Sequence, residues 1–438
     1  MLVDLYQLTM AQAYWRSGRT ASATFSLYFR TLPPERGYMV FAGLEDALDF
    51  LAGLKADPEL LGFLERREDF TPAFLDFLAN LRFTGSVRAM PEGTPCFPQQ
   101  PLLEVTGPVI EAQLAETYLL NQVNVQTTLA SKAARVVMAA RGRSVVDFGA
   151  RRTHGTDAAL KMARVGYLAG FGATSNVQAA EHYGIPAAGT MAHSFVTSFD
   201  SEIEAFREFV KTYPRSSTLL VDTYDTLAGV AAAIIVAHEA AAAGGSVAAI
   251  RLDSGDLGEL ARASRALLDE AGLGNVQIVA SGGLDEHSVD RLVRDGAPID
   301  VFGVGTKVGT SADAPYTDLV YKMVLYDGRP VMKLSTGKGN LPGPKQVHRR
   351  TEGGAYTGDL ICAESEPAPT GPGWRPLMET VMATGARTGE SPGLLALRNR
   401  WGQAMTQLPD GVRRLSDPEP YPVAASEGLK TLAIDAQP

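Results

Sequence analysis

Residues 276–306 read VQIVASGGLDEHSVDRLVRDGAPIDVFGVGT, and this stretch holds the unit that recurs through the middle of the chain. A short β-rich apolar run stands at each end and stops at a polar or glycine residue, with a helical pattern between the two runs. Strand–helix alternation of this kind builds parallel sheets, because each crossover helix must cover a face of the sheet. The stretch therefore predicts an α/β fold.

The same unit extends in both directions, from residue 144 to about residue 310. The predicted strands are Val145–Phe148, Phe171–Thr174, Ile185–Thr190, Leu219–Asp222, Ala248–Asp253, Val276–Ser281 and Asp300–Gly305. One helix between them should open at Asp200-Ser201, with Glu204 placed for a capping box, and another should span roughly residues 257–270. The spacing suits a barrel or a doubly wound sheet. Seven strands are one short of an eightfold barrel, so we predict an irregular (β/α) barrel.

The two ends of the chain follow a different pattern. The first ~130 residues mix helical segments with β-like pieces such as Thr24–Arg30 and Pro101–Val105. Near the other end, the turn signal Asp327-Gly328 separates the strand-like runs 319–326 and 331–335. We predict that residues 1–130 and about 331–438 form one α+β flanking domain, and that residues 131–330 form the barrel.

Composition limits the classes of partner and compartment. The net charge of −9 repels polyphosphate chains, so we expect no nucleic-acid partner, although a small anionic substrate remains possible. The two cysteines, Cys96 and Cys362, suit a reducing compartment. The N-terminus lacks the features of a signal peptide, and the longest apolar run, 227–237, is about half of a membrane span. We expect that run to be a buried helix, and the protein to be cytoplasmic and free of membrane.

Polar side chains stand where the predicted strands end. They are Arg151, Ser175, His193, Asp222, Arg251, Asp253, Ser281 and Thr306. In a barrel these positions gather at the C-terminal rim, where the loops carry the chemistry. The sequence therefore predicts a site at this rim.

Two glycine-rich turns predict a bound phosphate. Ser281-Gly282-Gly283 and Gly303-Val304-Gly305-Thr306 follow successive strands, and their bare N–H groups can point at a phosphate. A single glycine turn is usually only a turn. Two of them near the end of a barrel favour a phosphorylated substrate, because barrels commonly bind phosphate there.

Two further clusters each allow two interpretations. In Ile250–Asp256, Arg251 and Asp253 could form a structural salt bridge, or could bind an anion and a ribose or Mg²⁺. Phe148 and the arginine at 151 or 152 could be structural, or could stack on a flat aromatic acid and grip its carboxylate. Their position at strand ends favours the functional interpretation of both clusters.

His193 is the histidine of greatest interest. A lone histidine is more often structural than catalytic, but this one follows a predicted strand within a run of small residues. Asp222 could orient it. The segment around Asp222 faintly resembles the diphosphate-ribose loop of one class of phosphoribosyltransferases, but its acidic residues are separated, so we read it as part of the barrel.

Motifs spread over about 350 residues resemble the nicotinate phosphoribosyltransferases, a family of type II phosphoribosyltransferases. The matching segments are Asp4–Met10, Tyr28–Arg30, Gly37-Tyr38, Phe41–Glu45, Phe148–Arg152, Thr174–Asn176, Gly189–Phe195, Arg251–Asp256 and Lys333–Arg349 with Pro342-Gly343-Pro344-Lys345-Gln346. The resemblance implies an irregular α/β barrel with a flanking α+β domain, and a homodimer with shared active sites.

The resemblance also implies a reaction and roles for residues. Nicotinate would react with 5-phosphoribosyl 1-diphosphate to give nicotinate mononucleotide and pyrophosphate, a step of NAD salvage. Tyr6 of the partner subunit and Phe148 would sandwich the ring, Arg151 would lie near the ring and ribose phosphates, and Arg251 would hold an anion. Asp253 would contact the ribose or Mg²⁺. Thr174, Ser175 and Ser194 would line the substrate site, and Ser281, Gly282, Gly283, Gly303, Gly305 and Thr306 would cradle phosphate. ATP would be a co-substrate whose hydrolysis is coupled through a phosphohistidine at His193.

Three alternatives stay open at this point. The sister enzyme for nicotinamide resembles this chain but carries an acidic residue at the position of Ser175; a serine favours the acid substrate. An aldolase or isomerase on a barrel would need a catalytic lysine or carboxylate base, for which Lys307 is the best candidate. A non-enzymatic protein with the same fold is disfavoured by the presence of both glycine turns, Arg251, Asp253 and His193.

Overall fold

The computed structural model describes residues 1–334 and 339–437. The chain divides into two compact units, Met1–Ser131 with Tyr316–Pro438 and Lys132–Pro315. The sequence predicts the domain boundaries near residues 130 and 331. Helix α6 (Glu116–Ala139) runs from the first unit into the second.

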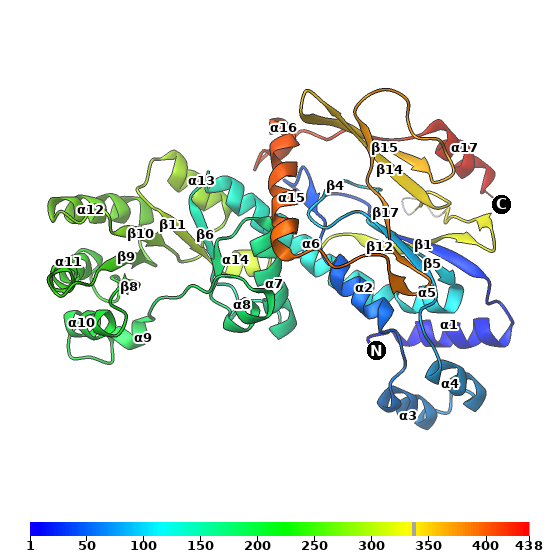
Figure 1. The fold of residues 1–438 in the computed structure, drawn as a ribbon, viewed down its shortest axis with the longest axis horizontal. Helices are drawn as coiled ribbons and strands as arrows, with labels where there is room; N and C mark the ends of the chain where they lie inside the picture. The colour runs from blue at the N-terminus through cyan, green and yellow to red at the C-terminus, as the bar shows by residue number, and fades with distance from the viewer. Residues whose placement is uncertain (335–338, 438) are drawn as a thin grey trace. The chain divides into compact units, whose positions relative to one another are not determined.

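The second unit is built on a parallel sheet (Figure 1). Within the described residues, the strand order is β7-β6-β11-β10-β9-β8. The strands are β6 (Ser144–Asp147), β7 (Ala173–Thr174), β8 (Ser217–Leu220), β9 (Val247–Leu252), β10 (Gln277–Ala280) and β11 (Val301–Val304). β7 and β8 lie at the two edges of this order, so the sheet is an incomplete barrel. The predicted irregular α/β barrel is confirmed.

The strand predicted at Ile185–Thr190 is wrong. Only a single parallel bridge forms there, between Ala187 and Thr174. Thr174 donates its N–H to the Pro186 carbonyl at 3.0 Å and accepts from the Ala188 N–H at 2.9 Å. Pro186 has no N–H of its own, which limits the pairing of this segment.

Helices follow each strand of the second unit. They are α7 (Thr156–Ala169), α8 (Val177–Tyr183), α9 (His193–Val196), α10 (Glu202–Thr212), α11 (Thr226–Ala242), α12 (Leu257–Glu270), α13 (Glu286–Arg294) and α14 (Thr306–Gly309). α12 has the predicted bounds. α10 begins after Ser201, whose hydroxyl accepts the Glu204 N–H at 3.4 Å and so caps the helix. The Glu204 side chain does not return a bond to the Ser201 backbone at this helix start, so only half of the predicted capping box forms.

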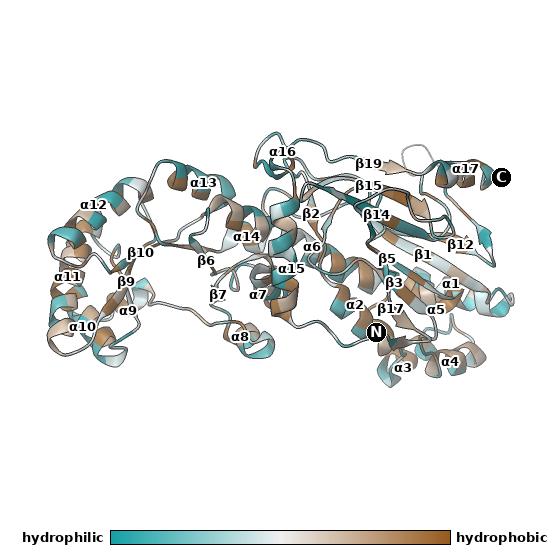
Figure 2. Ribbon diagram, turned by 45° about the horizontal axis from the view of Figure 1, so that its top comes forward, coloured by the Kyte–Doolittle hydropathy of each residue, from teal (hydrophilic) through white to brown (hydrophobic). Residues whose placement is uncertain are grey.

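The apolar run 227–237 is helical, as predicted, but it is not buried on all sides. It lies within α11, which is coloured largely hydrophobic in Figure 2. Val230, Ala233 and Val236 are buried, whereas Leu227 and Ile235 are 40% and 47% exposed. Within the described part of the chain, no helix has the length and apolar character to cross a membrane.

The first unit is an α+β assembly of mainly antiparallel sheets. In its described residues the largest sheet has the order β13-β12-β1-β5-β3-β17-β18, a second has the order β16-β14-β15-β19, and β2 pairs with β4. The strands are β1 (Ser22–Phe29), β2 (Met39–Val40), β3 (Ser86–Ala89), β4 (Pro95–Cys96), β5 (Leu103–Pro108), β12 (Leu319–Tyr326), β13 (Arg329–Pro330), β14 (Lys345–Glu352), β15 (Ala355–Ala363), β16 (Trp374–Pro376), β17 (Glu379–Ala383), β18 (Ala386–Arg387) and β19 (Val423–Ala425). The helices are α1 (Leu5–Arg16), α2 (Leu44–Ala52), α3 (Pro58–Arg66), α4 (Pro72–Ala79), α5 (Val109–Leu114), α15 (Leu394–Gln407), α16 (Asp410–Arg413) and α17 (Glu427–Asp435).

The predicted hairpin at Asp327-Gly328 is present. Both residues have a positive φ, 50° and 75°, which matches the twist of the flanking strands β12 and β13. The second strand is shorter and earlier than the predicted 331–335. It covers Arg329–Pro330, residues 331–334 are irregular, and Ser335 lies outside the described residues.

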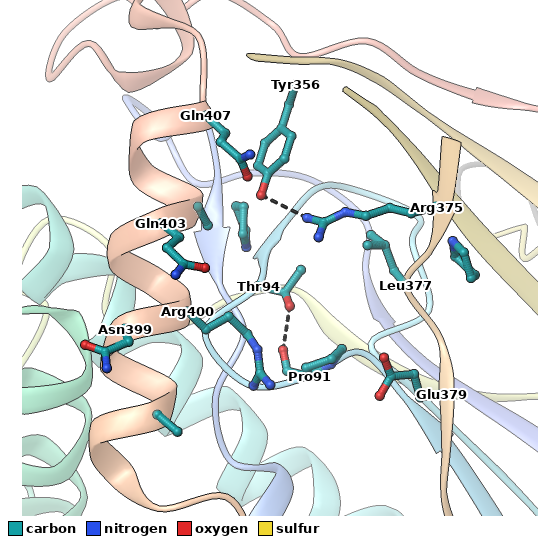
Figure 3. A pocket seen from close by; sticks show the side chains of 14 residues that line it. Pro91, Thr94, Tyr356, Arg375, Leu377, Glu379, Asn399, Arg400, Gln403 and Gln407 are labelled. Carbon is teal, nitrogen blue, oxygen red and sulfur yellow. Dashed lines mark hydrogen bonds between the residues drawn. The ribbon is translucent and has the colours of Figure 1, made fainter. Parts of the chain in front are cut away.

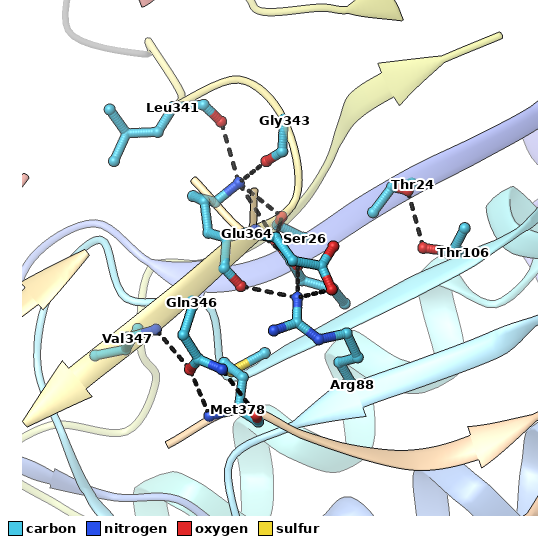
Figure 4. A network of polar contacts seen from close by, with 12 residues as sticks. Thr24, Ser26, Arg88, Thr106, Leu341, Gly343, Gln346, Val347, Glu364 and Met378 are labelled. Carbon is cyan, nitrogen blue, oxygen red and sulfur yellow. Dashed lines mark hydrogen bonds and ion pairs between the residues drawn. The ribbon is translucent and has the colours of Figure 1, made fainter. Parts of the chain in front are cut away.

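Lys345, in the Pro342–Gln346 motif, is buried, and its partners include Ser26 and Gly343 of the polar network in Figure 4. Its Nζ donates to Ser26 Oγ at 3.1 Å and to the Gly343 carbonyl at 2.6 Å, and lies 3.3 Å from Glu104 Oε1. Burial lowers the pKa of Lys345, while the Glu104 carboxylate opposes that shift. Separation of this pair would leave an uncompensated charge buried, which is strongly unfavourable. The contacts therefore stabilise the packing of this motif against β1 and β5.

Candidate active site at the strand ends of the second unit

The register of the parallel strands brings the predicted side chains together. Arg251 near the end of β9 is level with Val279 of β10, and Leu252 is level with Ala280. Ala280 in turn is level with Phe302 of β11. The residues that follow these positions therefore leave the sheet at the same edge, as the parallel arrangement requires.

Arg251 is the centre of the contacts at this edge. Its Nε donates to Ser281 Oγ at 2.9 Å, its Nη1 to Thr190 Oγ1 at 2.7 Å, and its Nη2 to Asp253 Oδ1 at 2.9 Å. The guanidinium carbon also lies 5.6 Å from the centre of the Phe148 ring. Only 13% of the Arg251 side chain is exposed, so its planar fork is held in one orientation by three partners.

Asp253 is held in its ionised form. Its Oδ1 accepts from both Arg251 and Ser281. Burial acts to raise the pKa of Asp253, but the hydrogen bonds from Ser281 and Arg251 lower it below its ordinary value. The carboxylate is therefore negative near neutral pH and 28% of it is exposed.

Phe148 fills the space that a side chain at Gly303 would need. A Cβ added at Gly303 would lie 2.6 Å from the Phe148 Cδ2 atom. Gly303 belongs to β11 itself, and only Gly305 and Thr306 follow the strand. The interpretation of Gly303 as part of a turn is therefore wrong: this glycine lies within the strand, and it makes room for the ring.

Asp147, to which the sequence assigned no role, supports the neighbouring strand end. It is buried, and its carboxylate accepts from the Gly149 N–H and from Thr174 Oγ1, each at 2.7 Å. Burial raises the pKa of Asp147. Thr174 is thus a buried partner of Asp147, while Ser175 beside it is exposed. The signal in the sequence that could have indicated this role is an acidic residue at the end of an apolar strand, followed by Phe148-Gly149.

His193 begins α9 and is 46% exposed. Its Nδ1 lies 3.1 Å from Thr223 Oγ1, and its Nε2 lies 3.9 Å from Asp253 Oδ2. The idea that Asp222 orients His193 is not supported. Asp222 Oδ2 instead accepts from the Asp253 N–H at 3.1 Å and from Ser254 Oγ at 2.5 Å.

The turn after β10 has the geometry that only glycine tolerates easily. Gly282 and Gly283 have φ values of +97° and +65°, and a Cβ on Gly282 would overlap the carbonyl oxygen of Asp253. Both glycines border a cavity of about 720 Å³. Other lining residues include Gly255, Arg262, Arg291 and Lys307.

Lys307 does not fit the catalytic lysine that an aldolase or isomerase needs. Its Nζ donates to Asp285 Oδ2 at 2.7 Å. Burial acts to raise the pKa of Asp285, but the hydrogen bonds from Lys307 and Ser288, together with the charge of Lys307, outweigh it and the pKa falls to about 2. The Lys307 amine is therefore held by a carboxylate instead of being available as a base or nucleophile.

The remaining predicted residues have simple environments. Arg151 and Ser194 are exposed in the second unit. Tyr6 belongs to α1 of the first unit and is 48% exposed. Burial and the neighbouring Glu116 carboxylate raise the pKa of Tyr6 to about 12, so its hydroxyl is neutral.

Among the described residues, no group of three or more His, Cys, Asp or Glu side chains could hold a metal ion.

A separate cavity of about 480 Å³ lies in the first unit (Figure 3). Arg375 on one wall donates to Tyr356 Oη at 3.0 Å, and Arg400 of α15 donates to the Glu92 carbonyl at 3.1 Å. Gln403 and Gln407 of α15 also line it. None of the predicted site residues does.

Comparisons with known proteins identify the family. The nicotinate phosphoribosyltransferase models match in three parts: the N-terminal domain over residues 1–124, the family core over 143–340 and the C-terminal domain over 370–433. A nicotinate phosphoribosyltransferase (pncB2) of Mycobacterium tuberculosis is 50% identical over 431 residues, covering 98% of this chain and 92% of that protein. One from Bacillus subtilis is 39% identical, covering 97% and 92%.

A solved structure agrees over the whole length. The crystal structure of human nicotinic acid phosphoribosyltransferase superposes with a TM-score of 0.89 at 31% identity, covering 100% of both chains. A nicotinate-nucleotide pyrophosphorylase from Pyrococcus furiosus, at 24% identity and a TM-score of 0.77, shares the fold. With the parallel sheet and the Arg251–Asp253–Ser281 cluster at its edge, these matches show that the chain belongs to the nicotinate phosphoribosyltransferase family of enzymes.

Proposed function

We propose that this enzyme joins nicotinate to 5-phosphoribosyl 1-diphosphate, giving nicotinate mononucleotide and pyrophosphate for NAD salvage. The observation that carries the proposal is the Arg251 fork, held by Ser281, Thr190 and Asp253 beside the Phe148 ring. A fixed cation, a carboxylate and an aromatic face stand together there. These are the groups that an anionic sugar and a flat pyridine acid need.

Phe148 offers a stacking surface for the pyridine ring, with Tyr6 of the partner subunit on the other side. Arg151 is exposed nearby in sequence and would neutralise the carboxylate of nicotinate. Ser175 is also exposed and carries no charge, so it does not repel a carboxylate. We therefore expect the enzyme to prefer nicotinate to nicotinamide.

The phosphoribosyl group would bind between Arg251, Asp253 and the turn at Ser281-Gly282-Gly283, with Gly305 and Thr306 beside it. The ring nitrogen attacks the anomeric carbon, the bond from that carbon to the diphosphate oxygen breaks, and the electron pair leaves with pyrophosphate. Positive charge develops on the ribose as the bond breaks. The ionised Asp253 carboxylate stabilises that charge electrostatically.

The donor set suits Mg²⁺ that arrives with the diphosphate rather than a metal held by the protein alone. Mg²⁺ typically uses one or two carboxylates together with substrate phosphates, and Asp253 Oδ2 is directed away from the Arg251 bond. When bound, the ion neutralises charge on the leaving group. Arg251 and the glycine turns would orient the sugar phosphate around it.

We further propose that ATP is a co-substrate and that His193 accepts its phosphoryl group transiently. The exposed imidazole, with Nδ1 at Thr223 and Nε2 facing Asp253, is accessible to a nucleotide. Ser194 follows it and is exposed as well. We also propose that the enzyme is a homodimer with shared active sites and that it is cytoplasmic.

The test is formation of nicotinate mononucleotide, with and without ATP, by the natural protein and by His193→Ala. We expect ATP to stimulate the natural protein and to have no effect on the variant. Equal stimulation of both would refute the role of His193 but leave the transferase activity intact. Comparable turnover of nicotinate and nicotinamide would refute the acid preference.

A further inference from the structure

Asp147 and Thr174 form a buried bridge between two adjacent strand ends of the second unit. Asp147 ends β6 and Thr174 ends β7, and the two residues are level in the parallel register. Thr174 Oγ1 donates to Asp147 Oδ2 at 2.7 Å, and each residue is only 1% exposed. A hydrogen bond to a buried carboxylate is strong, and its loss leaves the carboxylate oxygen without a donor. The bridge therefore fixes the distance between the ends of β6 and β7.

On the β6 side, the same carboxylate holds the turn that carries Phe148 and Arg151. Asp147 Oδ1 accepts the Gly149 N–H at 2.7 Å, which makes an Asx turn. The Gly149 carbonyl in turn accepts the Arg152 N–H at 2.8 Å. These two bonds fix the direction in which the chain leaves β6, and with it the positions of Phe148 and Arg151.

On the β7 side, the bridge holds the backbone on both sides of Ser175. The Ser175 N–H donates to the Asp147 carbonyl at 2.8 Å. The Asn176 N–H donates to Thr174 Oγ1 at 3.1 Å. The hydroxyl that donates to Asp147 therefore also holds the residue after Ser175. One carboxylate and one hydroxyl connect the segment of Phe148 with the segment of Ser175.

We propose that Asp147 is a positioning residue for nicotinate: through Thr174 it sets the distance between the aromatic wall and the uncharged wall of the pyridine site. This inference rests on the proposed function, in which Phe148 stacks on the ring and Ser175 accommodates the carboxylate. Asp147 and Thr174 are buried, so they act by holding these two walls. The proposed sugar contacts of Arg251–Asp253 lie at the end of β9, which pairs with neither β6 nor β7. The bridge should therefore affect nicotinate and leave the sugar phosphate almost unchanged.

The experiment compares Thr174→Val, Thr174→Ser, Asp147→Ala and the double variant Asp147→Ala/Thr174→Val in the full-length enzyme. Valine keeps the branched shape but removes the hydroxyl, serine keeps the hydroxyl, and alanine in place of Asp147 removes the acceptor of both bonds. The control is Thr24→Val, which removes another buried hydroxyl, 2.9 Å from Thr106 Oγ1 in the first unit (Figure 4). For each protein, kcat and the KM values for nicotinate and 5-phosphoribosyl 1-diphosphate are measured, and the thermal midpoint checks folding.

We expect Thr174→Val to raise KM for nicotinate roughly tenfold and KM for 5-phosphoribosyl 1-diphosphate less than about twofold, because Asp147 then lacks its donor. Thr174→Ser should recover most of that loss, since it restores the hydroxyl. The double variant should bind nicotinate no more weakly than Asp147→Ala, because the Thr174 hydroxyl then has no carboxylate to lose. Thr24→Val should leave both KM values unchanged, even where its thermal midpoint falls.

Three results would overturn the proposal while the transferase activity itself stands. One is a folded Thr174→Val enzyme with the natural KM for nicotinate, and another is an equal rise of both KM values, which marks a general loss of structure. The third is a double variant whose loss is the product of the two single losses, because the two residues would then act separately. The two Thr174 variants decide the question by themselves where Asp147→Ala does not fold. A natural enzyme that forms no nicotinate mononucleotide would instead contradict the proposed function.

Discussion

At the scale of single residues, Arg251 matters because one guanidinium meets several partners at once. Its three nitrogens contact Ser281, Thr190 and Asp253, and its face lies beside Phe148. An arginine fork can do this because its donors lie in one plane at fixed angles, whereas a lysine carries a single point of charge. The residue type, and not only its charge, is therefore part of the site.

Arg251→Lys should lower kcat/KM for 5-phosphoribosyl 1-diphosphate by about 10²- to 10³-fold, the usual effect of removing one fixed donor at a reacting group. The positive charge remains but cannot hold Asp253 and Ser281 together. Steady-state kinetics measure the loss. Full activity in the lysine variant would show that only the charge is needed.

Gly303→Ala should disturb nicotinate more than phosphoribosyl diphosphate. The new methyl would overlap the Phe148 ring, so we expect KM for nicotinate to rise and stability to fall by about 1–3 kcal/mol, as in other overpacked cores. Gly189→Ala is the matched control, since a Cβ there has no neighbour within 4 Å. Equal effects of the two changes on KM for nicotinate would contradict the assignment.

At the scale of elements, the caps decide where the barrel helices start. Asp256 accepts the N–H groups of Gly258 at 3.0 Å and Glu259 at 3.1 Å, so two otherwise unpaired donors of α12 are satisfied. Ser201 caps α10 with one longer bond of 3.4 Å. These short polar side chains lie between a strand and a helix in the sequence. The first residues of these helices could therefore be predicted from the sequence.

Asp256→Ala should cost about 1 kcal/mol of unfolding free energy, the typical value for loss of an N-cap. Ser201→Ala should cost less, because its single bond is long. Urea denaturation of both variants measures the difference. A larger loss for Ser201→Ala would show that the two caps do not differ as their geometry indicates.

Asp285 joins two elements, because it caps α13 through Ser288 and pairs with Lys307 of α14. Its pKa of about 2 lies below its ordinary value of 3.8, so the unfolded chain binds the proton more readily. The stabilisation is therefore complete above pH 4 and is lost as pH falls toward 2. Asp285→Asn should flatten the acid dependence of the thermal midpoint in that window; an unchanged slope would assign it to other carboxylates.

At the scale of the whole molecule, the proposed shared site would make activity depend on two chains. Tyr6→Ala and Phe148→Ala should each be nearly inactive. Mixed and reassembled in equal amounts, they should recover roughly a quarter of the natural activity, because about half of the dimers are mixed and each has one intact site. Activity is assayed before and after mixing. No recovery, from dimers shown to exchange subunits, would place Tyr6 in the site of its own chain.

The parts of the fold that depend on local pattern were predictable. Six of the seven proposed strands, the bounds of α12 and the Asp327-Gly328 hairpin are present. The exception, Ile185–Thr190, has an apolar start like the others, but Pro186 and Gly189 interrupt it. An apolar run shows that a segment is suitable for a strand; the available neighbours decide whether it becomes one.

The site was predictable as a set of positions but not as a set of contacts. Parallel strands must end at one edge, so Arg251, Asp253 and Ser281 could be grouped from sequence. The atoms that come into contact could not be predicted from the sequence. The sequence suggests Asp222 as a partner of His193, but Asp222 instead holds the Asp253–Ser254 turn, and the contacts of Asp147 are not foreseen.

The sequence by itself determined the fold class, the family and the residue types at the strand ends, because period, caps, turns and motifs are local properties of the chain. Only the tertiary structure decided that Gly303 makes room for Phe148 and that Lys307 pairs with Asp285. These facts depend on distances of a few ångströms between segments far apart in the sequence. Burial and charge at such distances, rather than residue type, set the protonation and orientation of each group.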